Sequence, residues 1–467
     1  MMLGTALNAV AEPSPALPPL AAGEQGQLFA LQGSNTVGAR LAPELARDYL
    51  MAKGVQRVSI RARGIANEYR VEGRYAGTLV FIDVAAHGTG TGMRGLASGV
   101  ADIAMASRPI TVAETQLFEH PEAMRTFEAE HVVAIDGLAV IVHPDNPVSS
   151  LTVDQIAGLF SGRFQNWSAV GGPERRVSLY ARDDRSGTWD SFRSMVLGDD
   201  NELVGGTPRF ESNDRLSDAV AADRGAIGFV GLASVRKTKA LSVSHANVRP
   251  LSPSPLYVAT EDYALARRLY FYTHPAQTSP LVAEFIHFAQ GELGQRRVAD
   301  VGFVAQTPVE FRPELPAGAP ADYQALAAHS ERLSINFRFD RGSSRLDNKA
   351  LWDVQRLTQF METPENRNRQ LQLIGFGDAH QSEQRAQVLS RMRALRVKAA
   401  LRDGGVEAAS VVGFGGLLPV AEGEGAGRLK NQRVEVWLFD SEAASTVNGI
   451  KTERWQTDRP PRAVDVR

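Results

Sequence analysis

The sequence predicts a two-domain protein in which a large α/β domain, long enough to be bilobal, precedes a smaller α+β domain. The chain has 467 residues, and single hydrophobic cores stop growing at about 250–300 residues. Over residues 28–306, strand-like apolar runs alternate with segments of helical period, a pattern typical of open α/β sheets whose ligands bind at the carboxyl ends of the strands. A Pro- and Ala-rich stretch at 307–332 has the composition of a linker, and a second ordered segment follows at 333–440.

Composition excludes several classes of function. The net charge is -2 and no basic run is interleaved with aromatic residues, so we expect no nucleic-acid partner. The absence of cysteine excludes disulfides, zinc–thiolate sites, iron–sulfur clusters and a cysteine nucleophile. The nine histidines form no H-x-x-x-H pair, and we expect neither a metal nor a cofactor. No stretch reaches the ~18 apolar residues of a membrane span, so no transmembrane segment is predicted.

The two ends of the chain carry little periodic pattern. Residues 1–27 begin with a short run of small apolar residues up to Ala9-Val10-Ala11, which has the form that precedes a signal-peptidase cut, but the usual positive charges are missing. This segment is either the remnant of an export signal, which we favour, or a disordered start. Residues 441–467 are polar and are expected to be disordered.

Three loops of the first domain share one chemistry. Each places glycine with Ser or Thr directly ahead of a helical segment: GSNTVG (33–38), HGTGTGMR (87–94) and RDDRSGT (182–188). The N–H groups of a first helical turn lack intrahelical acceptors and carry the positive end of the helix dipole. Glycine allows close approach to the backbone, and hydroxyls add donors. The loops therefore predict a site for a compact oxyanion, where Arg182 adds charge-assisted hydrogen bonds.

Other interpretations of these loops remain. Ser or Thr before a helix is also an ordinary N-cap, and glycine is an ordinary turn residue. The lysine of a nucleotide-binding P-loop is absent, so nucleotide hydrolysis is not indicated. Ser186 as the nucleophile of a phosphomonoesterase has neither a G-x-S-x-G elbow nor a histidine base motif beside it. We therefore expect a binding protein and not an enzyme.

The order of the motifs resembles the phosphate-binding proteins of ABC phosphate transporters over residues 28–306. Beyond the three loops, the resemblance lies in ADIAMASRPI, DGLAVIVHPDNPVSSLT, LFSGRFQNWSAVGG, GAIGFVG and GQRRVADVGFV. It implies a periplasmic-binding-protein fold in which two α/β lobes, joined by hinge strands, close on one anion. It assigns phosphate contacts to Thr36, Val37 through its N–H, Thr89, Arg182, Ser186, Gly187 and Thr188.

Residue 108 departs from this family pattern. Many of these proteins have an aspartate there, whose carboxylate accepts the proton of hydrogen phosphate, whereas this chain has Arg108 after Ser107. An acceptor carboxylate disfavours an anion that has no proton to donate, while an arginine accepts any oxyanion. Arg108 is either a further ligand contact or the partner of Asp102 or another carboxylate. The expected ligand is therefore phosphate or a similar oxyanion.

The second domain carries an acidic–basic pair. Asp378 follows a predicted strand and Arg393 lies on the next predicted helix. Such a pair either holds a zwitterion or forms a plain salt bridge across a loop. The motifs FRFDRGSSRL, GFGD, LSRMRA and GRLKNQRVEV resemble the OmpA-like peptidoglycan-binding domain. The resemblance implies that Asp378 and Arg393 hold the diamino acid of a peptidoglycan stem peptide, with Arg433 near the same face.

Two departures lower the affinity expected for the wall: Gly377 stands where the family has threonine, and Ala386 where it has asparagine. Together the domains predict a periplasmic solute-binding protein that captures phosphate for ABC transport and is tethered to peptidoglycan. Its expected partners are the anion, the stem peptide and an ABC permease. The alternative is a cell-envelope organiser or phosphate sensor without a transport role, because a transporter's binding protein normally diffuses to its permease.

Overall fold

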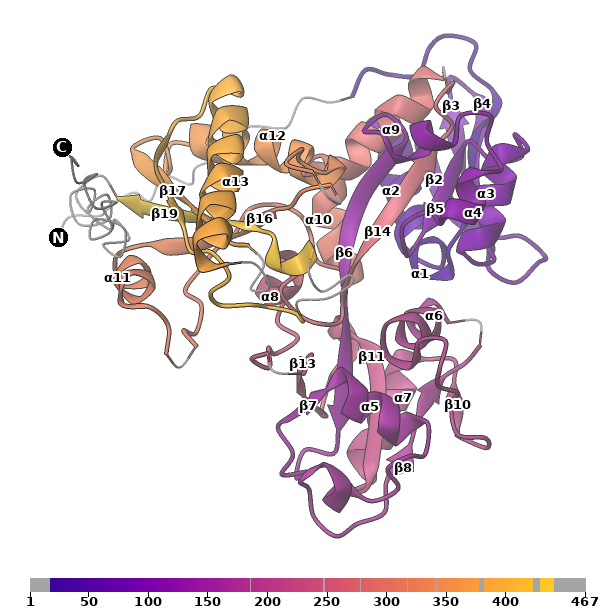
Figure 1. The fold of residues 1–467 in the computed structure, drawn as a ribbon. Coiled ribbons are helices and arrows are strands. Elements are labelled where there is room, and N and C mark those ends of the chain that lie inside the picture. Colours follow the sequence, from indigo (N-terminus) through magenta and orange to yellow (C-terminus); the bar gives the residue numbers. More distant parts are fainter. Residues whose placement is uncertain are drawn as a thin grey trace, which may run out of the picture.

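One ten-stranded sheet runs through both lobes of the first domain (Figure 1). The computed structural model describes residues 17–184, 186–246, 248–277, 279–316, 318–340, 343–377, 382–422 and 429–440. The spatial order of the strands is β2 (Gln56–Ala62), β3 (Glu68–Tyr75), β4 (Thr78–Ala86), β1 (Gly26–Gly33), β5 (Ile103–Ala106), β14 (Ala266–Thr273), β6 (Glu130–Val142), β11 (Ala226–Gly231) and β8 (Ser178–Leu179), with β12 (Lys239–Ala240) on β6.

Strand β6 is the physical link between the lobes. Its first part pairs antiparallel with β14, and residues 138–142 pair with β11. All of its residues except the first are buried, which explains its nearly continuous apolar sequence. Figure 1 shows β6 and β14 reaching from the upper lobe toward the lower one. These strands are therefore the hinge, and the predicted bilobal α/β fold is confirmed.

Each lobe has its own helices and its own aromatic core. Phe29, Tyr49 and Phe285 lie in the core of lobe 1, whereas Phe192 and Phe229 stack with ring centroids 3.8 Å apart in lobe 2. The helices of lobe 1 are α1 (Asn35–Gly38), α2 (Leu41–Ala52), α3 (Thr89–Ala97), α4 (Val112–Thr115), α9 (Pro280–Gln290) and α10 (Glu292–Val301). Lobe 2 has α5 (Val153–Phe160), α6 (Gly187–Phe192), α7 (Asn213–Ala222) and the strand pairs β7 (Ser150–Thr152) with β13 (Ser242–Ser244) and β9 (Ala181–Arg182) with β10 (Arg209–Phe210). The short helix α8 (Pro255–Ala259) follows lobe 2 and precedes β14.

The C-terminal domain is a five-stranded sheet with helices on both faces. Its strand order is β15 (Glu310–Phe311), β16 (Glu331–Phe337), β19 (Val434–Asp440), β17 (Arg369–Gly375) and β18 (Ala408–Gly413). The side chains of β19 alternate between the two faces. Val434, Val436 and Leu438 share a core with α12 (Asn348–Glu362) and α13 (Glu383–Asp403), whereas Trp437 and Phe439 share a core with α11 (Ala321–His329).

The segment predicted as a linker, 307–332, contains ordered structure. It includes β15, which pairs with β16, and α11, which begins directly after Pro320. Only Tyr323 and Leu326 of α11 are buried, so the helix leaves almost no apolar period in the sequence. The domain boundaries remain predictions, and residues 1–16 and 441–467 lie outside the described part of the chain. Within the described part, no helix is both long enough and apolar enough to cross a bilayer.

Candidate functional site

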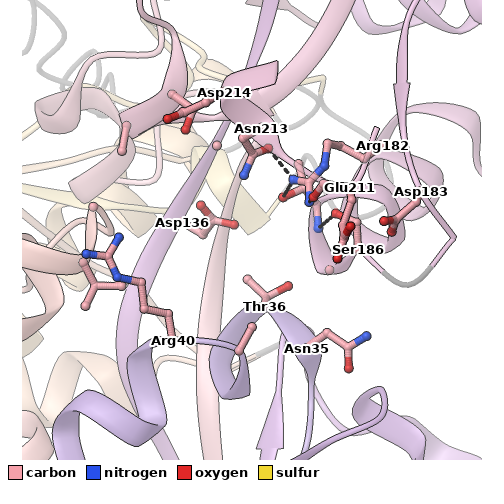
Figure 2. Close-up of a pocket in the computed structure, with 18 of the residues that line it drawn as sticks. Asn35, Thr36, Arg40, Asp136, Arg182, Asp183, Ser186, Glu211, Asn213 and Asp214 are labelled. Atoms are coloured by element: carbon pink, nitrogen blue, oxygen red, sulfur yellow. Dashed lines mark hydrogen bonds between the residues drawn. The ribbon is translucent and has the colours of Figure 1, made fainter. Parts of the chain in front are cut away.

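A cavity of about 880 Å³ lies between the lobes (Figure 2). Five of the predicted anion contacts line it: Thr36 from lobe 1, and Arg182, Ser186, Gly187 and Thr188 from lobe 2. These residues are separated by about 150 positions in the sequence and meet because α1 and α6 face each other across the hinge. The cavity thus lies at strand and helix ends, where α/β folds bind ligands.

The N-terminal ends of α1 and α6 face this cavity. The N-cap Ser34 makes no side-chain capping hydrogen bond to α1, and the first-turn N–H groups of a helix have no intrahelical acceptors. The Val37 side chain is fully buried in lobe 1, so only its N–H group is able to face a ligand. At α6, the Ser186 Oγ accepts hydrogen bonds from the N–H groups of Thr188 and Trp189 at 3.2 and 3.4 Å. The Ser186 hydroxyl proton stays available for donation.

The two helix ends touch at Gly187. A Cβ atom at this position would overlap Thr36 Oγ1 and would lie 2.5 Å from the Thr36 backbone nitrogen. Any larger residue would therefore push the lobes apart. The contact explains why the RDDRSGT loop carries glycine at the first position of α6.

Arg182 places a buried positive charge beside the helix ends. Its side chain is about 8% exposed, and Nε and Nη2 donate to the backbone carbonyls of Phe210 and Glu211 at 3.1 and 2.6 Å. Nη1 donates to Asn213 Oδ1 and, at 3.4 Å, to Thr188 Oγ1. All of these acceptors are neutral, and no ion pair of Arg182 occurs among the described residues. Burial lowers the pKa of Arg182, because the charge is desolvated. An anion entering the cavity would compensate this charge.

Asp136 and Arg267 form a second charged feature of the site, which the sequence did not predict. They lie opposite each other on the hinge strands β6 and β14. Arg267 Nε and Nη2 both donate to Asp136 Oδ2, at 3.0 and 2.7 Å, and Nη2 also donates to Thr36 Oγ1 at 3.1 Å. Since Thr36 Oγ1 accepts this bond, its own proton points elsewhere. Each charge stands within an apolar strand sequence, which is a signal that a buried partner exists.

The structure separates Thr89 and Arg108 from the other predicted contacts. Both line a second cavity of about 860 Å³. Thr89 is the first residue of α3, and its Oγ1 accepts a hydrogen bond from the Ser107 N–H at 3.3 Å. Arg267 lies between the cavities, because it lines the second and contacts Thr36 of the first.

Arg108 is engaged in an ion pair. Its Nη1 and Nη2 donate to the two carboxylate oxygens of Glu114 at 2.7 and 2.8 Å, and these bonds raise the pKa of Arg108. Asp102, the partner considered from the sequence, instead accepts the Ala30 N–H at 2.9 Å. Of the two interpretations of Arg108, the structure shows the ion pair, with Glu114 as the partner.

The structure places two of the three predicted wall-binding residues. Asp378 lies outside the described residues. Arg393 is on α13, where Nη1 donates to the Phe376 carbonyl at 3.4 Å. Arg433 is buried, and its Nε and Nη2 donate to Glu435 Oε1 at 3.0 and 2.9 Å. Because Arg433 and Glu435 alternate with Val434, they point toward α11 and away from α13. Arg433 also lies 3.9 Å over the Phe376 ring, and the carbonyl of the same residue accepts from Arg393. The shared wall-binding site stays a prediction.

Comparison with known proteins agrees with the fold and the motifs. Residues 62–292 match the PBP superfamily domain, and residues 338–433 match the OmpA family. Protein SphX of Synechococcus elongatus is 30% identical over 270 residues, which cover 55% of this chain and 77% of SphX. The chain belongs to the PBP superfamily. Both resemblances seen in the motifs are confirmed, and residues 28–306 and 333–440 are called the PBP domain and the OmpA domain below.

Further relatives carry names that refer to phosphate. The phosphate-binding protein PstS of Bacillus subtilis is 28% identical over 227 residues, 48% of this chain and 71% of PstS. The crystal structure of an ABC-type phosphate transport receptor from Vibrio cholerae is 26% identical, with a TM-score of 0.47, and the match covers 59% of this chain and 99% of the receptor.

Proposed function

We propose that this chain is a periplasmic receptor, not an enzyme, that holds phosphate or a similar tetrahedral oxyanion between its lobes. The observation that carries the proposal is the buried Arg182, whose hydrogen-bond partners among the described residues are all neutral, beside the N-terminal turn of α1. Relatives named as phosphate-binding proteins support the choice of ligand. The OmpA domain supports an attachment to peptidoglycan.

In this proposal each lobe presents one set of donors to the anion. Arg182 supplies charge, Ser186 and Thr188 supply lobe 2 donors, and Thr36 is oriented by its bond from Arg267. Because α1 and α6 touch at Gly187, an anion that bridges them must hold them slightly apart.

Titration calorimetry of the full chain with phosphate tests the function directly. We expect one phosphate to bind per chain. A chain that gives no heat with phosphate, arsenate or sulfate at millimolar concentration would not be an oxyanion receptor.

A second candidate function is a phosphate sensor or envelope organiser. It is favoured by the docking of the OmpA domain on the hinge side of the PBP domain, where Arg332 of β16 donates to Asp262 at 2.7 Å. Growth of a deletion strain on limiting phosphate separates the candidates. A growth defect supports transport, and normal growth supports the sensor or organiser.

Asp136 is expected to select an oxyanion that carries a proton. Both hydrogen bonds found for its carboxylate end on Oδ2, and the side chain lines the cavity. The second oxygen is therefore available to accept a proton from hydrogen phosphate, which sulfate lacks at neutral pH. A hydrogen bond to a charged group contributes about 1.5–3 kcal/mol, so Asp136→Asn should reduce the preference for phosphate over sulfate by roughly 10- to 150-fold.

Competition calorimetry with the two anions measures this preference. Asp145→Asn, on the exposed surface of lobe 2, is the matched control and should change nothing. Thermal melting of Asp136→Asn checks that the loss of the Arg267 partner leaves the chain folded. If the folded variant rejects sulfate as well as the unmodified chain does, Asp136 does not set the selectivity.

Arg393 is expected to be needed for binding to the cell wall. It lies half-buried on α13, on the face of the sheet opposite Arg433. Loss of one charge-assisted contact should reduce co-sedimentation of the full chain with purified sacculi by roughly tenfold or more. Arg391→Ala, an exposed arginine two residues earlier on the same helix, is the control. Equal retention of Arg393→Ala and Arg391→Ala would argue against this site.

A further inference from the structure

The outward face of α13 in the OmpA domain carries a row of exposed apolar side chains. Val388, Met392 and Leu395 are 56%, 57% and 46% exposed, and their spacing of four and three residues aligns them along the helix. The buried residues of α13 lie on its other side, toward the sheet (Figure 1): Ala386, Ser390, Ala394, Val397 and Leu401. Single exposed apolar residues are ordinary, but the outward face of such a helix is normally polar. The row therefore does not serve the core of the OmpA domain.

Basic side chains flank this apolar row on both sides. At about 100° per residue around the helix axis, Arg385 and Arg396 lie on one side of the row and Arg391 and Lys398 on the other. Residues 384–402 include no acidic residue. Since the whole chain has a net charge of -2, the helix is a local concentration of positive charge.

The four flanking cations are not neutralised by the rest of the chain. No ion pair of any of them occurs among the residues that the structure describes, whereas Arg402, near the end of the helix, pairs with Asp403 at 3.3 Å. Arginine and lysine have long apolar stems, so their charges can reach beyond an apolar surface that the stems help to cover. The outward face of α13 thus presents apolar surface and unneutralised positive charge together.

This combination favours one kind of partner. A second copy of the chain would bring the same cations together, and like charges across an interface repel. A purely ionic partner would leave the apolar row in water. A bilayer with anionic lipids suits both parts, because its acyl boundary receives the apolar row and its head groups receive the cations. The row also lies on the ridge of one helix, and a fluid bilayer needs no preformed groove to receive a ridge, whereas a protein partner does.

We propose that the outward face of α13 binds the surface of a bilayer that contains anionic phospholipids. Val388, Met392 and Leu395 enter the boundary between head groups and acyl chains, and the four cations lie among the lipid phosphates. The helix axis then lies parallel to the bilayer. Arg393 stays turned toward the Phe376 carbonyl, so the lipid contact leaves the predicted wall contact accessible. The anion cleft of the PBP domain takes no part in it.

Co-sedimentation of the full chain with sucrose-loaded vesicles tests the contact. We expect vesicles of equimolar phosphatidylcholine and phosphatidylglycerol to bind the chain roughly 100-fold or more tightly than vesicles of phosphatidylcholine alone, because each Lys or Arg near an anionic surface contributes roughly fivefold in affinity. Salt at about 0.5 M should remove most of this difference, since it screens exposed charges. Equal binding to both vesicles, or binding to neither, would overturn the proposal and leave an acidic protein as the partner that fits this face.

A substitution in the apolar row locates the contact on α13. Met392→Glu places a negative charge in the middle of the row and should weaken binding to the anionic vesicles by roughly tenfold or more. Met51→Glu is the matched control, because Met51 lies on α2 and is 58% exposed, and it should bind vesicles normally. Both positions are exposed, so thermal melting and phosphate calorimetry should match those of the unmodified chain.

A second pair of variants tests the flanking charges. Arg391→Ala combined with Arg396→Ala should weaken binding to the anionic vesicles by roughly 25-fold. Arg175→Ala combined with Arg176→Ala removes two exposed arginines of lobe 2 and should leave binding unchanged. If the α13 variants bind the anionic vesicles as tightly as their controls do, the outward face of α13 is not the membrane contact.

Discussion

Replacing Arg182 with alanine is expected to weaken phosphate binding by at least about 100-fold. The guanidinium is buried and is held toward the cavity by neutral oxygens alone, so its charge is available to the ligand. Removing one partner of a buried charge pair costs about 3–5 kcal/mol, and 1.4 kcal/mol corresponds to a tenfold change in affinity. Calorimetric titration of the full-length variant measures the loss.

Two controls separate the charge from the geometry. Arg182→Lys keeps a positive charge but lacks the planar fork that spans two acceptors, so it should restore only part of the affinity. Arg175→Ala removes an exposed arginine of the same lobe and should leave binding intact. If Arg182→Ala binds phosphate as tightly as Arg175→Ala does, the anion does not occupy the interlobe cavity.

Much of this site was visible in the sequence because its chemistry is local. A glycine–hydroxyl loop before a helix marks the N-terminal end of that helix, so Thr36 and the 182–188 loop are predictable as candidate contacts without a fold. The Arg108–Glu114 pair was also within reach. Thr111 and Glu114 form a capping box three residues apart, and that motif places the carboxylate close to residue 108.

Other features depend on how distant segments pair. Asp136 meets Arg267 only through the register of β6 with β14, across 131 residues. Nothing in either segment specifies that register. The orientation of Arg433, in contrast, is predictable from alternation along the strand: counted from Val434, its side chain faces away from α13.

Asp262 lies in the interface between the PBP domain and the OmpA domain, where its loss is expected to destabilise the chain. Its side chain is 2% exposed and accepts from Arg332 and Asn336 of the OmpA domain. Beside it, Glu261 accepts from Arg338 Nε at 3.0 Å. Burial alone would raise the pKa of Asp262, but the nearby arginine charges outweigh this effect and lower it. Asp262→Ala would leave buried arginines without their anion.

We expect Asp262→Ala to lower the free energy of unfolding by about 3–5 kcal/mol. Urea unfolding followed by tryptophan fluorescence measures this, and limited proteolysis within residues 307–332 reports undocking of the domains. Asp218→Ala is the matched control, because Asp218 pairs with Arg236 at 3.1 Å on the surface and is 56% exposed. Surface pairs of this kind contribute about 0–1 kcal/mol. Equal stability of the two variants would contradict the role given to Asp262.

The direction of the pKa shift adds a pH test of the same interface. Because folding lowers the pKa of Asp262, its contribution is fully present above the ordinary carboxyl pKa of ~3.9 and is lost as the pH falls below that value. The unmodified chain should therefore become sensitive to proteolysis between the domains in acid, whereas Asp262→Ala should already be sensitive at neutral pH.

The strand β14 links this interface to the anion cleft. Arg268 pairs with Glu261 of the PBP domain and with Asp347 of the OmpA domain, and its neighbour Arg267 donates to Thr36. Consecutive strand residues point to opposite sides, so loosening the interface at Asp262 is also expected to change phosphate affinity.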